Sequence, residues 1–166
     1  MRALPKIFVL LSVIVLSANI TYSHCQIPCG IYGDNTRIDL LKEHILTIEK
    51  GMNQINELSK KSAENMNQLV RWVNNKDNHA DEFTEIVTYY FLSQRIKVTD
   101  INNTEEFKTY QKKLTLLHQM MVFSMKCKQT TDLQNVEKLK SLVDEFAEIY
   151  FTPEQKEHLK DHNKSQ

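Results

Sequence analysis

The sequence predicts an all-α protein, an up-down antiparallel four-helix bundle. Four separate segments repeat apolar residues at steps of three and four, which is the spacing of one face of an α-helix. The 166 residues include only three Gly and three Pro, so little material is available for turns and long elements are expected. The sequence contains no β-hairpin signal and no internal repeat. Amphipathic helices with short connections pack most economically as a bundle, and the length suits one domain.

The first two helices follow a turn-rich stretch at residues 33–35. Gly51 lies inside the first helix, where glycine costs about 1 kcal/mol relative to alanine. Ser62 is a suitable N-cap for the second helix. A polar run at residues 74–78 interrupts the second stripe and leaves two alternatives, one continuous helix or a break. The predicted core positions are Ile38, Leu41, Ile45, Ile48, Met52, Ile55 and Leu58 in the first helix, and Met66, Leu69, Val70, Val73, Ala80, Phe83, Val87, Tyr90 and Phe91 in the second.

The third and fourth helices complete the bundle, which we expect over residues 35–152. Asn103, with Glu106 three residues later, resembles a capping box at the start of the third helix. The fourth begins near Asp132. Thr152–Pro153 has the cap-plus-proline pattern of a short helix in the C-terminal tail, residues 153–166. The predicted core positions are Phe107, Tyr110, Leu114, Leu117, Met121 and Met125, followed by Leu133, Val136, Leu139, Val143, Phe146 and Tyr150.

Residues 1–23 have the anatomy of a cleaved secretory signal peptide. Arg2 and Lys6 form its positive region, and residues 7–16 form an apolar core shorter than the roughly 20 residues of a membrane span. Thr21 and Ser23 suit the −3 and −1 positions of a cleavage site, so cleavage would leave His24 first. An uncleaved anchor is the alternative. After cleavage we expect a secreted or lumenal protein without a membrane segment. The net charge of zero gives no indication of a nucleic-acid partner.

The new N-terminus, residues 24–34, concentrates metal-ligand chemistry. His24 would offer both its imidazole and an α-amine, whose ordinary pKa is about 8. Cys25 would offer a thiolate and a backbone nitrogen, Cys29 a second thiolate, and Pro28 restricts the loop between them. Amine, amidate and two thiolates form a planar set with the imidazole on its axis. Such a plane disfavours tetrahedral zinc and suits nickel or copper, and donor geometry alone does not choose between these two.

Residues 24–32, HCQIPCGIY, resemble the nickel hook of the nickel superoxide dismutase family, H-C-x-x-P-C-G-x-Y. The stretch Asn67–Lys76 is similar to that family's N-x-L-x-R-aromatic-V-x-x-K, and Tyr89–Phe91 resembles its Asp-Tyr-Phe. The resemblance implies a four-helix bundle that binds one nickel ion per subunit and assembles as a homohexamer. It also implies an enzyme that converts two superoxide ions and two protons to hydrogen peroxide and dioxygen, through Ni(II)/Ni(III) cycling.

The resemblance also implies roles for individual residues. The nickel ligands would be His24, Cys25 and Cys29, with His24 as the axial donor in catalysis. Tyr32 would stand over the open axial side, gating small anions and ordering water. The residues supporting this site would be Pro28, which shapes the hook, Asp39, which orients the imidazole, Arg71, which completes that contact, and Tyr90, which hydrogen-bonds towards Tyr32.

The sequence departs from the family pattern at three places. Gly33–Asp34 stands where the family has Asp-Pro, Asp39 replaces a glutamate, and Leu92–Arg95 replaces Lys-Pro-Pro-His. Two other functions stay open from the residues themselves. One is a non-enzymatic secreted helical bundle with a Cys25–Cys29 disulfide, since this spacing in a secreted chain is commonly a disulfide. The other is a hook that binds copper.

The remaining cysteine and histidines are not expected to ligate the metal. Cys127, between two lysines, is predicted to be structural or incidental. The other histidines form no spaced ligand set and are predicted to be surface residues, with His79 and His118 the two that could neighbour the site; they are His44, His79, His118, His158 and His162.

Overall fold

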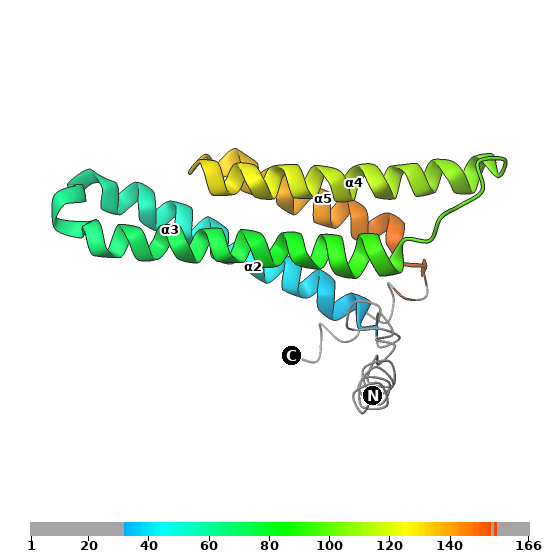
Figure 1. Cartoon of the computed structure of the whole chain (residues 1–166), viewed down its shortest axis with the longest axis horizontal. Coiled ribbons are helices and arrows are strands. Elements are labelled where there is room, and N and C mark those ends of the chain that lie inside the picture. The colour runs from blue at the N-terminus through cyan, green and yellow to red at the C-terminus, as the bar shows by residue number, and fades with distance from the viewer. Residues whose placement is uncertain (1–31, 154, 156–166) are drawn as a thin grey trace, which may run out of the picture.

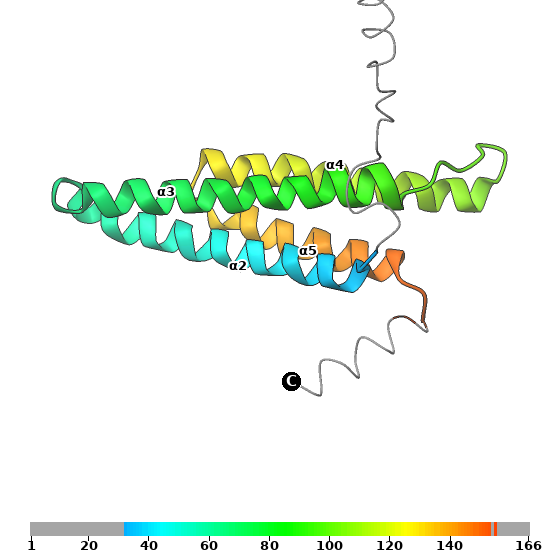
Figure 2. The same cartoon turned by 60° about the horizontal axis from the view of Figure 1, so that its bottom comes forward.

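A computed structural model describes residues 32–153 and 155. Four α-helices in this part of the chain lie side by side along the long axis of the molecule (Figure 1), and a view turned by 60° shows the same arrangement (Figure 2). They are α2 (Asp34–Leu58), α3 (Ser62–Glu85), α4 (Thr104–Gln129) and α5 (Leu133–Tyr150). Neighbouring helices are antiparallel, with α2 packed on α3 and α5, and α4 packed on α3 and α5. The predicted all-α bundle is confirmed.

The α2–α3 hairpin contains the two points at which the sequence predicted a disturbance. Helix α2 continues through Gly51, and α3 continues through residues 74–78, so the alternative of a break there is wrong. Gly51 is buried where the two helices approach closely, because a Cβ added there would lie 3.1 Å from the Cβ of Lys76. The predicted capping by Ser62 is also wrong. Lys61 is the N-cap, without a side-chain cap hydrogen bond, and a short 3₁₀ turn, η1 (Ser59–Lys61), joins the helices.

The predicted apolar stripe of α3 is buried over only half of its length. Ala80 and Phe83 are in the core, whereas Met66, Val70 and Val73 are exposed. Both views show why, since the α2–α3 hairpin extends beyond the α4–α5 turn (Figures 1 and 2). Within the described residues, nothing covers the apolar face of that projecting end. These three residues were predicted to be in the core, and that prediction is wrong.

A π-helix, η2 (Ile86–Arg95), continues α3 without interruption. The backbone N–H of Ile96 donates to the carbonyl of Phe91, five residues earlier, at 3.0 Å. The side chains of Ser93 and Gln94 likewise donate to carbonyls five residues earlier, at 2.7 Å each. Hydrogen bonds of this span widen the turn, so residues five apart lie on one side of the helix. The sequence did not predict this element, which frequently marks functional sites.

The caps of the later helices agree with the sequence only in part. Asn103 is the N-cap residue of α4, but its side chain makes no cap hydrogen bond, so the capping box predicted with Glu106 is wrong. Helix α5 begins beside Asp132 as predicted, and Asp132 is its N-cap, accepting from the N–H of Gln134 at 3.0 Å. The start of the C-terminal helical turn is confirmed, since Thr152 and Gln155 form a reciprocal capping box with bonds of 3.0 and 3.3 Å.

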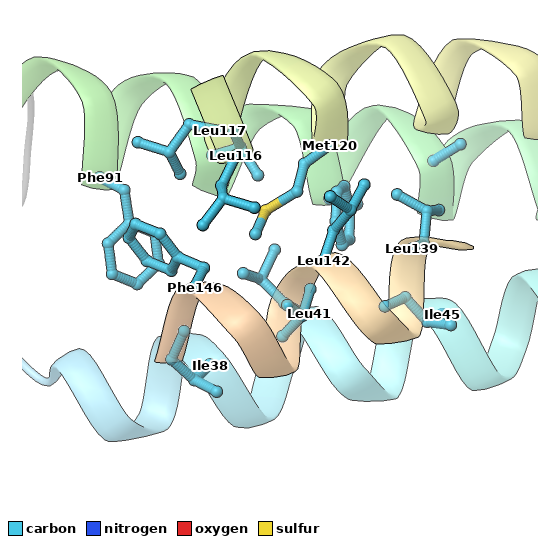
Figure 3. Close-up of a cluster of buried hydrophobic side chains, with 14 of the residues drawn as sticks. Ile38, Leu41, Ile45, Phe91, Leu116, Leu117, Met120, Leu139, Leu142 and Phe146 are labelled. Atoms are coloured by element: carbon cyan, nitrogen blue, oxygen red, sulfur yellow. The ribbon is translucent and has the colours of Figure 1, made fainter. Parts of the chain in front are cut away.

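The core lies between all four helices. Side chains from α2, η2, α4 and α5 point towards one another, with Phe91 and Phe146 edge to face at a centroid distance of 5.1 Å (Figure 3). The buried face of α4 is formed by Leu116, Leu117, Met120, Ser124 and Cys127. Met125, predicted to be in this core, is exposed instead. Among the described residues, no helix combines the length and hydrophobicity needed to cross a bilayer.

One cation is buried where α3 meets the end of α4. The ammonium of Lys76 donates to the carbonyls of Cys127 and Lys128 at 2.7 and 2.8 Å, and it contacts Asp77 at 2.6 Å. The last carbonyls of a helix have no partners within the helix and form its negative end. The ammonium of Lys76 therefore supplies hydrogen-bond donors to these carbonyls and a positive charge at the end of α4.

Candidate metal centre

Four of the predicted site residues lie outside the part of the chain that the structure describes: His24, Cys25, Pro28 and Cys29. Tyr32, the last residue of the motif, is the first described residue. It lies two positions before α2 and is 43% exposed. The structure therefore describes the surface that Tyr32 contacts, and this surface is built around Asp34.

Asp34, the first residue of α2, accepts hydrogen bonds from three side chains. The hydroxyl of Tyr90 donates at 2.6 Å and the Nε of Arg95 at 2.8 Å, both to Oδ1. The hydroxyl of Tyr150 donates to Oδ2 at 2.8 Å. A second nitrogen of Arg95 pairs with Oδ2, so the guanidinium engages both carboxylate oxygens. We call these four residues the Asp34 cluster. It joins the start of α2, the π-helix and the end of α5.

The π-helix accounts for two of these contacts. Tyr90 and Arg95 are five residues apart, and both reach the same oxygen of Asp34. Residues five apart lie on one side of a π-helix, whereas an α-helix brings together residues three or four apart. The wider turn thus directs the phenol and the guanidinium to one carboxylate.

Tyr32 packs against the Asp34 cluster through its ring. It meets the ring of Tyr90 edge to face at a centroid distance of 6.1 Å, and the guanidinium of Arg95 lies 4.1 Å from its centroid. The guanidinium of Arg37 covers the ring of Tyr90, at 5.1 Å. The structure thus brings Tyr32 and Tyr90 together, as predicted. The hydrogen bond expected from Tyr90 to Tyr32 goes to Asp34 instead, because the carboxylate is the stronger acceptor.

The charges of the Asp34 cluster shift its pKa values in opposite directions. Burial raises the pKa of Asp34, but the hydrogen bonds from Arg95, Tyr90 and Tyr150 outweigh burial and hold it below its ordinary 3.8. Burial, followed by the bond to the Asp34 carboxylate, raises the pKa of Tyr90 to about 12. The same causes raise the pKa of Tyr150. Near neutral pH both phenols therefore remain protonated donors that position Asp34.

The other two supporting residues predicted from the sequence are not part of the Asp34 cluster. Asp39 lies exposed on α2, just over one turn beyond Asp34. Arg71 lies exposed on α3, and α3 continues for 14 more residues to Glu85 before η2 begins. At a rise of about 1.5 Å per residue, that places Arg71 roughly 20 Å along the helix from the start of the π-helix. The guanidinium that contacts Tyr32 belongs to Arg95.

Asp34, Arg95 and Tyr150 were not predicted as site residues. Two of them stand where the sequence departs from the family pattern, Asp34 after the motif tyrosine and Arg95 at the end of Leu92–Arg95. When an acidic and a basic residue both depart from a family pattern, as Asp34 and Arg95 do, the two departures together indicate an ion pair. Tyr150 gave no such signal, because it was one more aromatic position in an apolar stripe.

The structure also revises the interpretation of other polar residues. Cys127 is fully buried, and burial raises the pKa of its thiol to about 11, which agrees with the predicted structural role. His44 and His79, predicted to be surface residues, instead face each other with Nδ1 atoms 2.8 Å apart, and Glu82 lies beside both. No sequence pattern indicated this pair, because the two residues are 35 positions apart on different helices.

The described fold is a helical bundle, and the N-terminal motif groups histidine and cysteine residues, a combination expected of a helical-bundle metalloprotein. The family profile described as nickel-containing superoxide dismutase matches residues 19–155. The chain therefore belongs to the nickel-containing superoxide dismutase family. Comparisons with curated proteins and with solved structures returned no significant match. The protein is a nickel-dependent enzyme that disproportionates superoxide to hydrogen peroxide and dioxygen.

Proposed function

We propose that His24, Cys25 and Cys29 would hold nickel at a processed N-terminus, with Tyr32 beside the site. The observation that supports this most is the contiguous HCQIPCGIY motif, whose last residue packs on the Asp34 cluster. The donor chemistry fits nickel, since anionic thiolate and amidate donors favour a planar site and a higher oxidation state. When bound, nickel supplies one-electron transfer between its divalent and trivalent states.

The residues around Tyr32 would prepare the surface on which superoxide and its protons arrive. The Tyr32 hydroxyl, on a partly exposed ring, is the group proposed to order water and deliver protons. Tyr90 is unsuited to that task, because a phenol with a pKa of about 12 releases a proton poorly near neutrality. Arg95 holds the Tyr32 ring from one side and Tyr90 contacts it with an edge, so both are positioning residues.

Two residues, Asp39 and Arg71, are candidates for orienting the His24 imidazole. Asp39 is exposed and only about 8 Å of helical rise from Asp34, so its carboxylate is available to an imidazole near the start of α2. Arg71 would require the hook to extend along α3, far from the Asp34 cluster. We therefore assign the guanidinium of the site to Arg95 and retain Asp39 as the acceptor for His24. Pro28 keeps its proposed role of shaping the hook.

Processing and location follow from the same donor set. The α-amine of His24 can act as a ligand only if residues 1–23 are removed, and their composition suits a secretory signal. We propose that the enzyme is secreted or acts in the lumen of the secretory pathway.

Assembly from identical subunits, a hexamer by family resemblance, is proposed for the mature enzyme. The projecting end of the α2–α3 hairpin supports this, because Met66, Val70 and Val73 form an exposed apolar strip on successive turns of α3. Such a face is unusual on a subunit that remains alone in solution.

Substitution of single cysteines tests the ligand set. Cys25→Ser and Cys29→Ser should each lose nickel and superoxide dismutation, because a neutral hydroxyl does not replace a thiolate donor. The matched control is Cys127→Ser, which should retain one nickel per subunit although the buried hydroxyl lowers stability. The measurements are metal content and superoxide decay by pulse radiolysis, normalised to bound nickel.

One outcome would reject the assignment, namely nickel lost in Cys127→Ser and retained in Cys29→Ser. The N-terminus is tested separately by adding one residue before His24. This addition should abolish activity and leave the helical content unchanged, since the motif precedes the bundle.

A further inference from the structure

A second group of metal-ligand side chains lies on the α2–α3 interface and includes no residue of the N-terminal motif. His44 projects from α2, and His79 and Glu82 project from α3. The Nδ1 atoms of the two imidazoles are 2.8 Å apart, and the Oε2 of Glu82 lies 3.4 Å from one and 3.6 Å from the other. Among the described residues, this is the one group of three such side chains whose ligand atoms all converge.

The separations are close to those of a metal coordination sphere. Zinc binds imidazole nitrogen and carboxylate oxygen at about 2.0–2.2 Å, which places two ligands of a tetrahedral ion about 3.3 Å apart. The two nitrogen–oxygen distances are near this value, at 3.4 and 3.6 Å. The nitrogen–nitrogen distance of 2.8 Å is that of a hydrogen bond, so the two rings would separate by about 0.5 Å to admit an ion. A small χ rotation of either imidazole supplies that shift.

The helices present these donors in a fixed arrangement. His79 and Glu82 are three residues apart and therefore share one face of α3, while His44 faces them from α2. The imidazole of His44 is only 12% exposed, and burial is the largest cause of the lowering of its pKa, which favours the neutral form that binds metal. A hydrogen bond between two Nδ1 atoms also requires at least one of them to be unprotonated.

An ion can reach the group from solvent. A cavity of about 260 Å³ is lined by His44 and Glu82 and extends past Arg37 to Tyr90 of the Asp34 cluster. The side chain of Glu82, which lines this cavity, is more than half exposed. Three protein ligands beside an open cavity leave room for water as a further ligand, as in sites that exchange their metal or use it.

We propose that His44, His79 and Glu82 bind one divalent transition-metal ion of the zinc class, at a site that shares no ligand with the nickel hook. Two imidazoles and a carboxylate suit zinc and cobalt(II), and this donor set lacks the thiolates that stabilise trivalent nickel. The second ion does not depend on the proposed ligands of the catalytic nickel.

The test uses the full chain with the hook donors removed by His24→Ala, Cys25→Ser and Cys29→Ser. Zinc titrated into this protein by calorimetry should bind with a stoichiometry of one. Cobalt(II) should give the visible absorption of a site with nitrogen and oxygen ligands. Adding His44→Gln, His79→Gln or Glu82→Gln should weaken zinc binding at least tenfold, since even residues that only support a ligand contribute 10–100-fold.

The matched control is His118→Gln, which removes an exposed histidine of α4 and should leave zinc affinity unchanged. Circular dichroism checks that each variant folds, and Glu82→Gln, at an exposed position, keeps the test valid if a histidine variant unfolds. Absence of zinc binding in the hook-less protein would overturn the proposal. Binding that is unaffected by all three ligand substitutions, or equally weakened by His118→Gln, would overturn it as well.

Discussion

The Asp34 carboxylate is the residue on which the surface beside Tyr32 depends. One arginine and two tyrosines donate hydrogen bonds to it. Hydrogen bonds to a charged group stabilise a fold more than bonds between neutral groups. Each partner can be removed alone, and because the contacts share one carboxylate, their effects on stability are coupled.

Tyr90→Phe should lower the free energy of unfolding by about 1.5 kcal/mol or more, because the bond to a partly buried carboxylate is lost. Urea denaturation measures this change. The neighbouring Tyr89→Phe is the control, since Tyr89 is about half exposed, and it should stay within about 0.5 kcal/mol of the parent. Equal losses in the two variants would contradict the assigned bond.

The same carboxylate predicts how stability depends on pH. The pKa of Asp34 in the folded chain lies below its ordinary 3.8, so the charged group stabilises the fold above about pH 4. That contribution is lost as pH falls through the folded-state pKa. Asp34→Asn should be less stable at pH 7 and should lose less stability than the parent on acidification below about pH 4. Urea unfolding at several pH values measures both effects.

The control for this substitution is Asp144→Asn, which replaces an exposed carboxylate paired with Lys42. It should change the stability at pH 7 only slightly, because exposed ion pairs contribute little. An Asp34→Asn curve parallel to that of the parent throughout the acid range would show that Asp34 does not contribute.

At the scale of the element, Lys76 connects α3 to the end of α4. Lys76→Met keeps the length of the side chain but leaves two helix-terminal carbonyls without their donor. We expect a loss of about 2–3 kcal/mol in the free energy of unfolding. Lys128→Met, which breaks only a surface pair with Asp81, should cost about 0.5 kcal/mol. Comparable losses from both substitutions would argue against a special role for the buried cation.

Local sequence patterns predicted the helices well, but they predicted poorly which parts of each helix are covered by other helices. Helix α5 begins next to Asp132, where its start was predicted, and buries the predicted positions Val136, Leu139, Val143 and Phe146, because both signals lie within the segment itself. The first half of α3 was placed in the core wrongly. Periodicity identifies which face of a helix is apolar, and it does not say whether another helix is long enough to cover that face.

The π-helix and the Asp34 cluster were missed for a related reason. A π-helix forms when side-chain contacts outweigh the poorer local geometry, and those contacts come from other elements. Asp34 meets Arg95 and Tyr150 across 61 and 116 positions, so no window of sequence contains the set. The N-terminal motif could be recognised because it lies within nine consecutive residues, 24–32, whereas its ligand set stays a prediction because residues 24–31 are outside the described part of the chain.

For the whole molecule, the projecting hairpin predicts self-association. Val70→Glu should shift the mature protein towards smaller species in light scattering coupled to gel filtration, because it places a charge in the exposed apolar strip. The helical content should remain, since Val70 is 51% exposed in the single subunit. Val98→Glu is the control, at a connecting residue that is 86% exposed, and should leave the mass unchanged. An unaltered mass in Val70→Glu would remove this strip from the assembly contact.

The composition of the Asp34 cluster has a consequence for the order of events during synthesis. The hook motif and Asp34 leave the ribosome early, but the last partner of Asp34 is Tyr150, near the end of the chain. The surface beside Tyr32 can therefore be completed only after Tyr150 has been synthesised, so it is among the last parts of the fold to form.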